Sequence, residues 1–132
     1  MHRRIFLLSS AAVLFPCLSA AYPAEDFSPS LWRDLRETDR VVILNYRASW
    51  SLTCQIKADL IAEAIAANPA YGELTFIDVD WDTFGRSQLT ERLKVERRST
   101  LLVMKNGREV ARLVNEPYER PIRALLDSAL VA

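Results

Sequence analysis

The sequence predicts a three-layer α/β domain built around a mixed β-sheet. Short apolar runs, typical of strands buried on both faces, alternate with segments in which apolar residues recur every three or four positions, as in amphipathic helices. The third such run is followed by Asn106-Gly107, a type I′ hairpin signal that makes the last two strands antiparallel. The predicted order is therefore α-β-α-β-α-β-β-α, with helical crossovers joining parallel strands.

The elements follow from capping residues, prolines and apolar runs. Ser28 and Ser51 can cap the first two helices, because a serine hydroxyl accepts hydrogen bonds from the free N–H groups of a first turn. Pro29 and Pro121 suit a first turn, whereas Pro69 ends the second helix. The expected elements are a leader over 22–27, helices over 28–37, 51–68, 82–94 (the weakest) and 118–130, and strands over 41–44, 74–79, 100–104 and 109–114.

The helix over 51–68 begins directly after a buried strand. Its two faces are an apolar line of Cys54, Ala58, Ile61 and Ile65 and a polar line of Gln55, Asp59 and Glu63. Residues with these spacings share one side of a helix, so the apolar line is expected to pack on the sheet. The sequence thus places Cys54 one turn inside a helix, with Trp50 at the junction between strand and helix.

The first 21 residues are predicted to be a signal peptide. Arg3 and Arg4 give a positive start, residues 5–18 form a mostly apolar run, and Ser19-Ala20-Ala21 supplies small residues for cleavage before Tyr22. The run is too short to span a bilayer comfortably, so we expect export to the periplasm and no stable membrane insertion after cleavage. The start also resembles a twin-arginine signal, and the sequence leaves the export route open.

Cleavage changes the inventory of chemical groups. It removes His2, the single histidine, and Cys17, one of two cysteines, and leaves 15 Lys+Arg against 17 Asp+Glu in the domain over 22–132. This near-balance gives no basis for a nucleic-acid partner. One thiol without an imidazole excludes Ser-His-Asp and Cys-His nucleophiles, the usual zinc sites and an internal disulfide. Cys17 also allows a lipoprotein interpretation, which Pro16 disfavours because a small residue is expected there.

The stretch around Trp50 resembles the active-site region of thioredoxin-like proteins, in which a strand ends in Trp-Cys-x-x-Cys and the first cysteine lies at a helix N-terminus. This chain has Trp50-Ser51-Leu52-Thr53-Cys54, so a serine replaces the first cysteine and the second is kept. The resemblance extends to about Leu130. It implies the thioredoxin-like fold, a three-layer α/β/α sandwich with a mixed sheet, and a family of thiol-disulfide oxidoreductases.

Three departures from the family pattern fall in this one site. The resemblance places the nucleophilic thiol at Ser51, the buried acid that manages the proton of the second thiol at Asn45, and a cis-proline at Ser99. An alcohol is too weak an acid to replace a thiol without a base beside it, and an amide does not titrate. A competent dithiol oxidoreductase is therefore not expected, and the sequence leaves open whether the protein is an enzyme.

The candidate site residues each have a plainer structural interpretation. Cys54 is either a reactive thiol or a buried small apolar residue, and Ser51 is most simply a helix cap. Trp50 is expected to pack in the wall of the site. Arg97-Arg98 is either a solvated loop or, through the alignment of Ser99, a pair beside Trp50 that holds an anion or an acidic partner.

Three aspartates, Asp78, Asp80 and Asp82, are spaced by two around Trp81 and raise the question of a metal site. No glycine turn or distant glutamate completes a calcium loop, so solvated carboxylates at the end of a strand are the better interpretation. No metal or other cofactor is expected.

Two functional hypotheses remain. The first is a periplasmic thioredoxin-like redox protein with a single thiol, in which Cys54 forms a mixed disulfide with a partner that supplies the other sulfur. The second is a non-catalytic binding or chaperone-like module that holds an exported polypeptide near Trp50 and Ser99. The solvent exposure of Cys54 discriminates between them.

The mature chain should begin near Tyr22, because Ser19 and Ala21 flank the plausible cleavage point after the apolar run. Intact-mass measurement on exported protein tests this expectation. A species that retains residues 1–21 would reverse the assignment of compartment.

Overall fold

The computed structural model describes residues 22–132 and carries both helices and strands. The predicted signal peptide, including Cys17, lies outside the described residues. The elements are β1 (Ala24–Asp26), α1 (Pro29–Leu35), β2 (Val41–Arg47), α2 (Leu52–Ala67), the 3-10 helix η1 (Pro69–Glu73), β3 (Thr75–Asp80), α3 (Trp81–Phe84), α4 (Gln88–Arg92), β4 (Thr100–Lys105), β5 (Arg108–Val114) and α5 (Glu119–Leu130).

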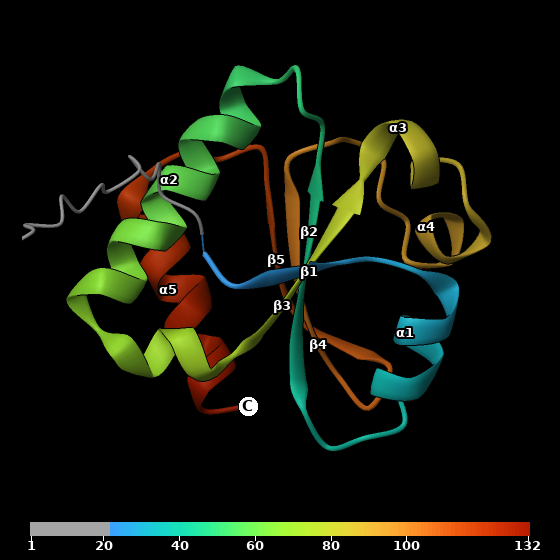
Figure 1. Ribbon diagram of the computed structural model, residues 1–132, viewed down its shortest axis with the longest axis horizontal. Coiled ribbons are helices and arrows are strands. Elements are labelled where there is room, and N and C mark those ends of the chain that lie inside the picture. The colour runs from blue at the N-terminus through green and yellow to red at the C-terminus, as the bar shows by residue number, and fades with distance from the viewer. Residues whose placement is uncertain (1–21) are drawn as a thin grey trace, which may run out of the picture.

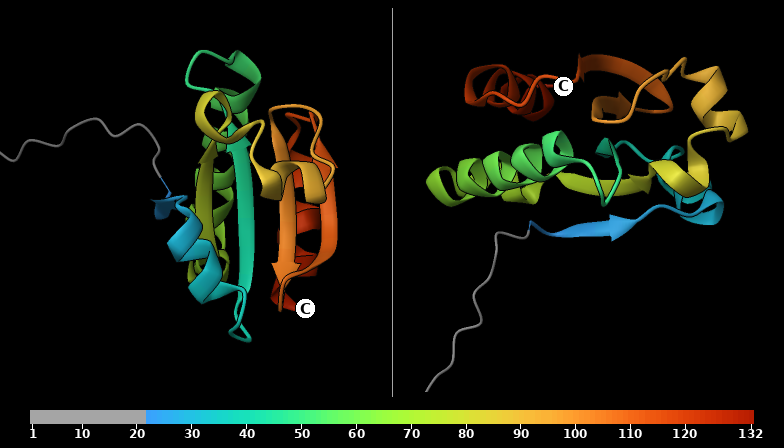
Figure 2. Two further views of the ribbon diagram at one scale, coloured as in Figure 1. Left: turned by 90° about the vertical axis from the view of Figure 1, so that its right-hand side faces the viewer. Right: turned by 90° about the horizontal axis from the view of Figure 1, so that it is seen from above.

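The strands form one mixed sheet in the order β1-β3-β2-β4-β5. Strands β1, β3 and β2 are parallel, whereas β4 runs antiparallel to both β2 and β5. Helices α2 and α5 cover one face, and α1, α3 and α4 lie on the other (Figure 1). Figure 2 shows β1 and the β4–β5 pair at opposite edges of the sheet. The predicted three-layer α/β architecture is confirmed.

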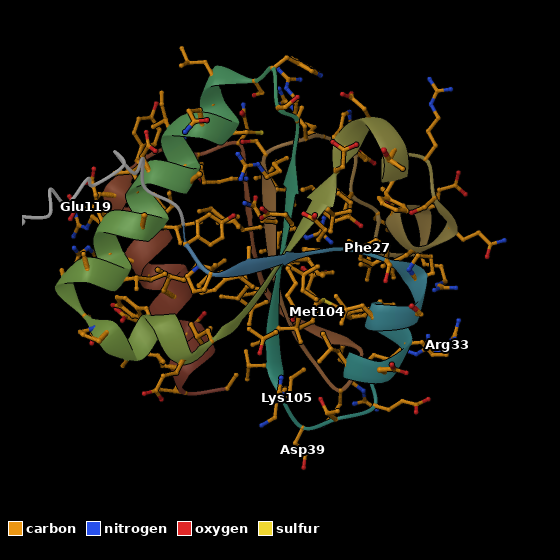
Figure 3. The ribbon with its side chains drawn as sticks, in the orientation of Figure 1. Phe27, Arg33, Asp39, Met104, Lys105 and Glu119 are labelled. Carbon is orange, nitrogen blue, oxygen red and sulfur yellow. The ribbon has the colours of Figure 1, made fainter. Side chains whose placement is uncertain are left out.

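Each face of the sheet carries its own apolar core. Ile43 and Phe76 face α2 and α5, whereas Leu44 faces the α1 side because neighbouring strand residues point to opposite faces. Phe27 and Met104 belong to the α1 side, as Figure 3 shows. Each such side chain contributes about 1.5–3 kcal/mol on full burial. The two cores together hold β2 in the middle of the sheet.

Two elements differ from the sequence prediction. The expected leader over 22–27 contains β1, which pairs with β3 from Ala24 opposite Phe76 and is too short to show a pattern in the sequence. The single helix expected over 82–94 is divided into α3 and α4. The helix restarts because Ser87 is a new N-cap, whose hydroxyl accepts from the N–H of Thr90 at 3.2 Å.

The β4–β5 hairpin turns as the sequence predicts. Asn106 and Gly107 have φ of 54° and 76°, the left-handed values that a type I′ turn requires at both central positions. Within residues 22–132, no helix is both long and apolar enough to cross a membrane.

Candidate functional site

The candidate site lies where β2 passes into α2. Ser51 has the extended backbone of an N-cap, and its hydroxyl accepts from the N–H of Cys54 at 3.3 Å. The Cys54 sulfur accepts in turn from the N–H of Ala48 at 3.4 Å. These two bonds fold the first turn of α2 back against the strand, and the predicted helix cap at Ser51 is confirmed.

Cys54 is fully buried, yet polar groups surround its sulfur. Ser99 is also buried, its hydroxyl has no hydrogen-bond partner in the part of the chain that the structure describes, and it lies near enough to stabilise a Cys54 thiolate. Burial raises the pKa of the Cys54 thiol. The side chains of Ser51 and Ser99, the Ala48 N–H and the charge of Lys57 favour the thiolate and outweigh that effect, so the pKa falls below its ordinary value of 9.0.

Lys57 is the most unusual side chain near the site. It lies one helical turn after Cys54 on the buried face of α2, it is 1% exposed, and its Nζ has no hydrogen-bond partner among residues 22–132. Burial, with a smaller contribution from the charge of Arg47, lowers the pKa of Lys57 from 10.5 to about 8, although Cys54 and Asp78 act in the opposite direction.

The sheet beneath Lys57 carries a hydrogen-bonded network. Asn45 donates to the hydroxyl of Tyr22, which donates to Asp78 Oδ1 at 2.6 Å, and Arg47 Nη1 lies 3.3 Å from Asp78 Oδ2. Burial, followed by the charge of Asp78, raises the pKa of Tyr22 above its ordinary value of 10.0. We call this network, together with Cys54 and Lys57, the buried cluster.

Asn45 and Asp78 are directly opposite each other in the β2–β3 register. The neighbouring strand therefore places a carboxylate beside Asn45, with Asp78 Oδ1 3.4 Å from Asn45 Nδ2. Asp78 and Arg47 also line a pocket of about 310 Å³ at this end of the sheet, so one side of the buried cluster has access to solvent. The other residues that line this pocket are Asp26, Phe27, Ser49, Asp80 and Phe84.

Trp50 is 60% exposed, so the expectation that it packs in a wall of the site is wrong. Its Nε1 donates to both carboxylate oxygens of Asp82 at 3.1 and 3.2 Å, and the guanidinium carbon of Arg98 lies 4.7 Å from its ring centroid. Leu52 and Ile56, on the outer side of the first turns of α2, are also exposed. We call Trp50, Leu52 and Ile56 the Trp50 surface.

The structure separates the residues predicted to bind a partner. Arg98 stacks on Trp50, and the Arg97 side chain is exposed. Ser99 instead points inward to Cys54, with a left-handed φ of 63°. Its N–H donates to the carbonyl of Tyr46 at 2.8 Å, which fixes the loop against the end of β2.

The three aspartates also have separate roles. Asp78 belongs to the buried cluster, Asp80 caps α3 by accepting from the N–H of Thr83 at 3.0 Å, and Asp82 holds the indole of Trp50. The interpretation of all three as solvated strand-end carboxylates is therefore wrong for Asp78. Over the described range 22–132, no three His, Cys, Asp or Glu side chains are arranged to share a metal ion.

Sequence reasoning missed Lys57, Tyr22 and Arg47. A signal for Lys57 was present, since a residue three positions after Cys54 lies on the same helical face, where a lysine interrupts an apolar line. Tyr22 meets Asp78 through the pairing of β1 with β3, which no local pattern announces. That contact is a product of tertiary structure alone.

A Ser51→Cys substitution should form a 51–54 disulfide under mild oxidant. Residues three apart in a first turn have Cα atoms about 5 Å apart, within the roughly 4.4–6.8 Å that disulfide geometry allows. Mass spectrometry after alkylation detects the disulfide, because cysteines in a disulfide are not alkylated. Leu52→Cys is the matched control, because that position is exposed on the other side of the helix and should stay reduced. A Ser51→Cys variant that stays reduced would contradict the shared turn.

The free energy of unfolding should rise as the pH increases from about 8 toward 10. Folding lowers the pKa of Lys57 to about 8 from 10.5, so between these values the unfolded chain binds more protons and a higher pH favours the folded state. The lowered pKa of Cys54 acts in the same direction. Urea unfolding at several pH values measures the effect.

Lys57→Met should flatten this pH dependence, whereas Lys105→Met, at the other end of the sheet, should retain it. An unfolding free energy that falls between pH 8 and 10 in the wild type would contradict the burial of a titrating lysine.

No protein-family model matches the sequence. The chain is 30% identical over 76 residues to thioredoxin-1 of Saccharomyces cerevisiae, covering 58% of this chain and 69% of that protein. It is 29% identical over 86 residues to thioredoxin H5 of Oryza sativa, covering 65% of this chain and 60% of that protein.

Solved structures agree with these relatives. Trxlp from Edwardsiella tarda superposes with a TM-score of 0.66 at 25% identity, over 80% of this chain and 96% of that one. The thioredoxin of Malassezia sympodialis has a TM-score of 0.69 at 20% identity, over 87% and 97%, and supports the fold alone. The thioredoxin fold supports a general role in thiol redox chemistry, and the sequence relatives together with the matching architecture show that this chain belongs to the thioredoxin family.

Proposed function

We propose that this is an exported thioredoxin-family protein that takes part in thiol-disulfide exchange through one thiol, Cys54, and is not a dithiol oxidoreductase. The observation that carries the proposal is the polar setting of the Cys54 sulfur. A structural cysteine in an apolar core keeps its proton, whereas this thiol has a lowered pKa, with the Ala48 N–H, the Ser51 and Ser99 side chains and Lys57 favouring its thiolate.

The exchange step needs a disulfide in the partner. The Cys54 thiolate attacks one sulfur of that disulfide, the partner's S–S bond breaks, a bond forms between Cys54 and the attacked sulfur, and the other partner sulfur leaves as a thiolate that takes up a proton. Ser51 has no sulfur with which to displace the partner. The mixed disulfide therefore lasts until a thiol from outside the domain resolves it.

Access to Cys54 requires local opening. The thiol is fully buried, and Ser51, which covers it at the start of α2, is nearly so. Two hydrogen bonds hold this turn closed, from Ala48 to the sulfur and from the Cys54 N–H to Ser51. A partner that docks on the exposed Trp50 surface and loosens the first turn of α2 would expose the sulfur.

The proposed export limits the partners to polypeptides that are found in the same compartment. The predicted signal peptide over 1–21 would place the domain over 22–132 in the periplasm, an oxidising compartment in which disulfide-bearing polypeptides are common. We therefore propose an exported polypeptide that carries a disulfide or a reactive thiol as the partner.

A second function is favoured by one specific observation, the complete burial of Cys54 beside a well-exposed Trp50 surface. On this alternative the protein is a binding or chaperone-like module, and partners bind to Trp50, Leu52 and Arg98 without any reaction at sulfur. Trp50 is 60% exposed and Leu52 73% exposed, so both are available to an apolar segment of a partner.

Oxidised glutathione should add once to the wild-type protein, as a mass increase that reductant removes and that Cys54→Ala abolishes. Because Cys54 is buried, the native reaction should be roughly a hundredfold slower than in urea, which corresponds to an opening free energy of about 3 kcal/mol. Insulin reduction with dithiothreitol should stay at the uncatalysed rate, since the domain over 22–132 contains no second thiol to resolve the mixed disulfide.

Two results would contradict the redox proposal. Insulin turnover well above background would restore a dithiol mechanism. A wild-type protein that gains no adduct, yet binds an unfolded exported polypeptide in a manner that Trp50→Ala weakens, would favour the binding module instead.

A further inference from the structure

The thiol of Cys54 and the ammonium of Lys57 occupy the same buried side of α2. They are three residues apart, a spacing that makes side chains neighbours on a helix surface, and the two are 0% and 1% exposed. A lysine is almost never buried this completely without a partner, because removing an ammonium from water is strongly unfavourable.

The neighbouring carboxylate does not satisfy Lys57. Asp78 Oδ1 accepts from Tyr22 and Oδ2 from Arg47, so the hydrogen bonds of this acid are directed to the sheet. Lys57 Nζ is left without a hydrogen-bond partner in the described part of the chain. The negative charge that acts on Lys57 most strongly is the one that Cys54 would carry, ahead of that of Asp78.

The net charge of the buried cluster also favours a thiolate at Cys54. Lys57 from α2 is the charged group that acts on Cys54, and Lys57 in turn feels Arg47 from β2 and Asp78 from β3, which also contacts the neutral Tyr22. Ionised, these groups carry two positive charges and one negative charge. A thiolate at Cys54 makes the cluster neutral, and a buried cluster with no net charge is far less unfavourable than one with a surplus.

We propose that Lys57 is the counter-ion that holds Cys54 as a thiolate, and that mixed-disulfide formation at Cys54 depends on this ammonium. The inference rests on the proposed single-thiol function, to which it adds a residue. The Ala48 amide donates to the sulfur and the Ser51 and Ser99 hydroxyls lie beside it, whereas Lys57 supplies the charge that these neutral groups lack.

The counter-ion has a consequence for the lifetime of the product. When the thiolate forms a mixed disulfide, its negative charge leaves with the partner's other sulfur and Lys57 becomes an unpaired buried cation. Lys57 then releases its proton, which the departing partner thiolate takes up, so atoms and charges balance. The ion pair thus stabilises the reduced protein relative to the adduct and makes the mixed disulfide easy to reverse.

The test is a pH titration of the ultraviolet absorbance of the thiolate in the folded protein, with Cys54→Ala subtracted as the blank. The wild-type thiol should ionise with a midpoint below its ordinary pKa of 9.0. Lys57→Met, which keeps the volume and removes the charge, should raise the midpoint by at least about one pH unit, equivalent to a tenfold loss of thiolate at a given pH. Lys57→Arg, which keeps the charge, should restore a low midpoint.

Lys105→Met is the matched control, because Lys105 lies at the end of the sheet remote from the start of α2, as Figure 3 shows. It should leave the titration unchanged. Far-ultraviolet circular dichroism confirms that each variant is folded. If Lys57→Met does not fold, the wild-type titration decides, since a thiol that stays protonated to about pH 9 overturns the proposal.

The glutathione adduct separates failure of this inference from failure of the proposed function. A low thiol midpoint that rises in Lys57→Met but yields no adduct would refute single-thiol exchange and leave the counter-ion assignment in place. An adduct that forms equally fast and reverses equally easily in wild type and Lys57→Met, with equal midpoints, would refute the role of Lys57 and leave the exchange function in place.

Discussion

Strand β2 has no free side, and this constraint governs the rest of the structure. It pairs with β3 along one edge and β4 along the other, and helices cover both of its faces. The side chains from Val42 to Tyr46 are buried and must therefore find their partners inside the protein. Val42 to Leu44 do so with apolar neighbours, and from Asn45 onward the strand needs polar ones. The buried cluster meets that need at the end of the strand that leads into α2.

The charged residues of the buried cluster stand at different positions from those that the thioredoxin-like pattern predicts. The acid is missing at Asn45 but present on the neighbouring strand as Asp78, and a lysine enters from the helix at Lys57. Electrostatics in a poorly solvated interior depends on the sum of nearby charges more than on which strand carries each one. A site with altered residues can thereby keep a thiol with a lowered pKa.

The two sides of the α2 N-terminus correspond to the two functional hypotheses, thiol exchange and partner binding. The inner side holds Cys54, Lys57 and Ser99 out of contact with solvent, whereas the outer side presents Trp50 and Leu52. In the proposed exchange, a partner would meet the outer side first and would reach the sulfur only by opening a turn held by two hydrogen bonds. Binding and exchange would then be sequential steps, and the stability of this helical turn would decide whether bound partners react.

Elements with local signals could be predicted from the sequence. The apolar run at 41–44, the cap at Ser51 and the Asn106-Gly107 turn predicted the strand, the helix and the hairpin, because capping and turn geometry depend on a few adjacent residues. The resemblance around Trp50 and Cys54 then indicated the family. Tertiary structure alone decided that β1 is a strand, that Trp50 is exposed and that Asp78 joins Tyr22 and Arg47. Burial and long-range hydrogen bonds depend on which segments pack together, and no local pattern carries that information.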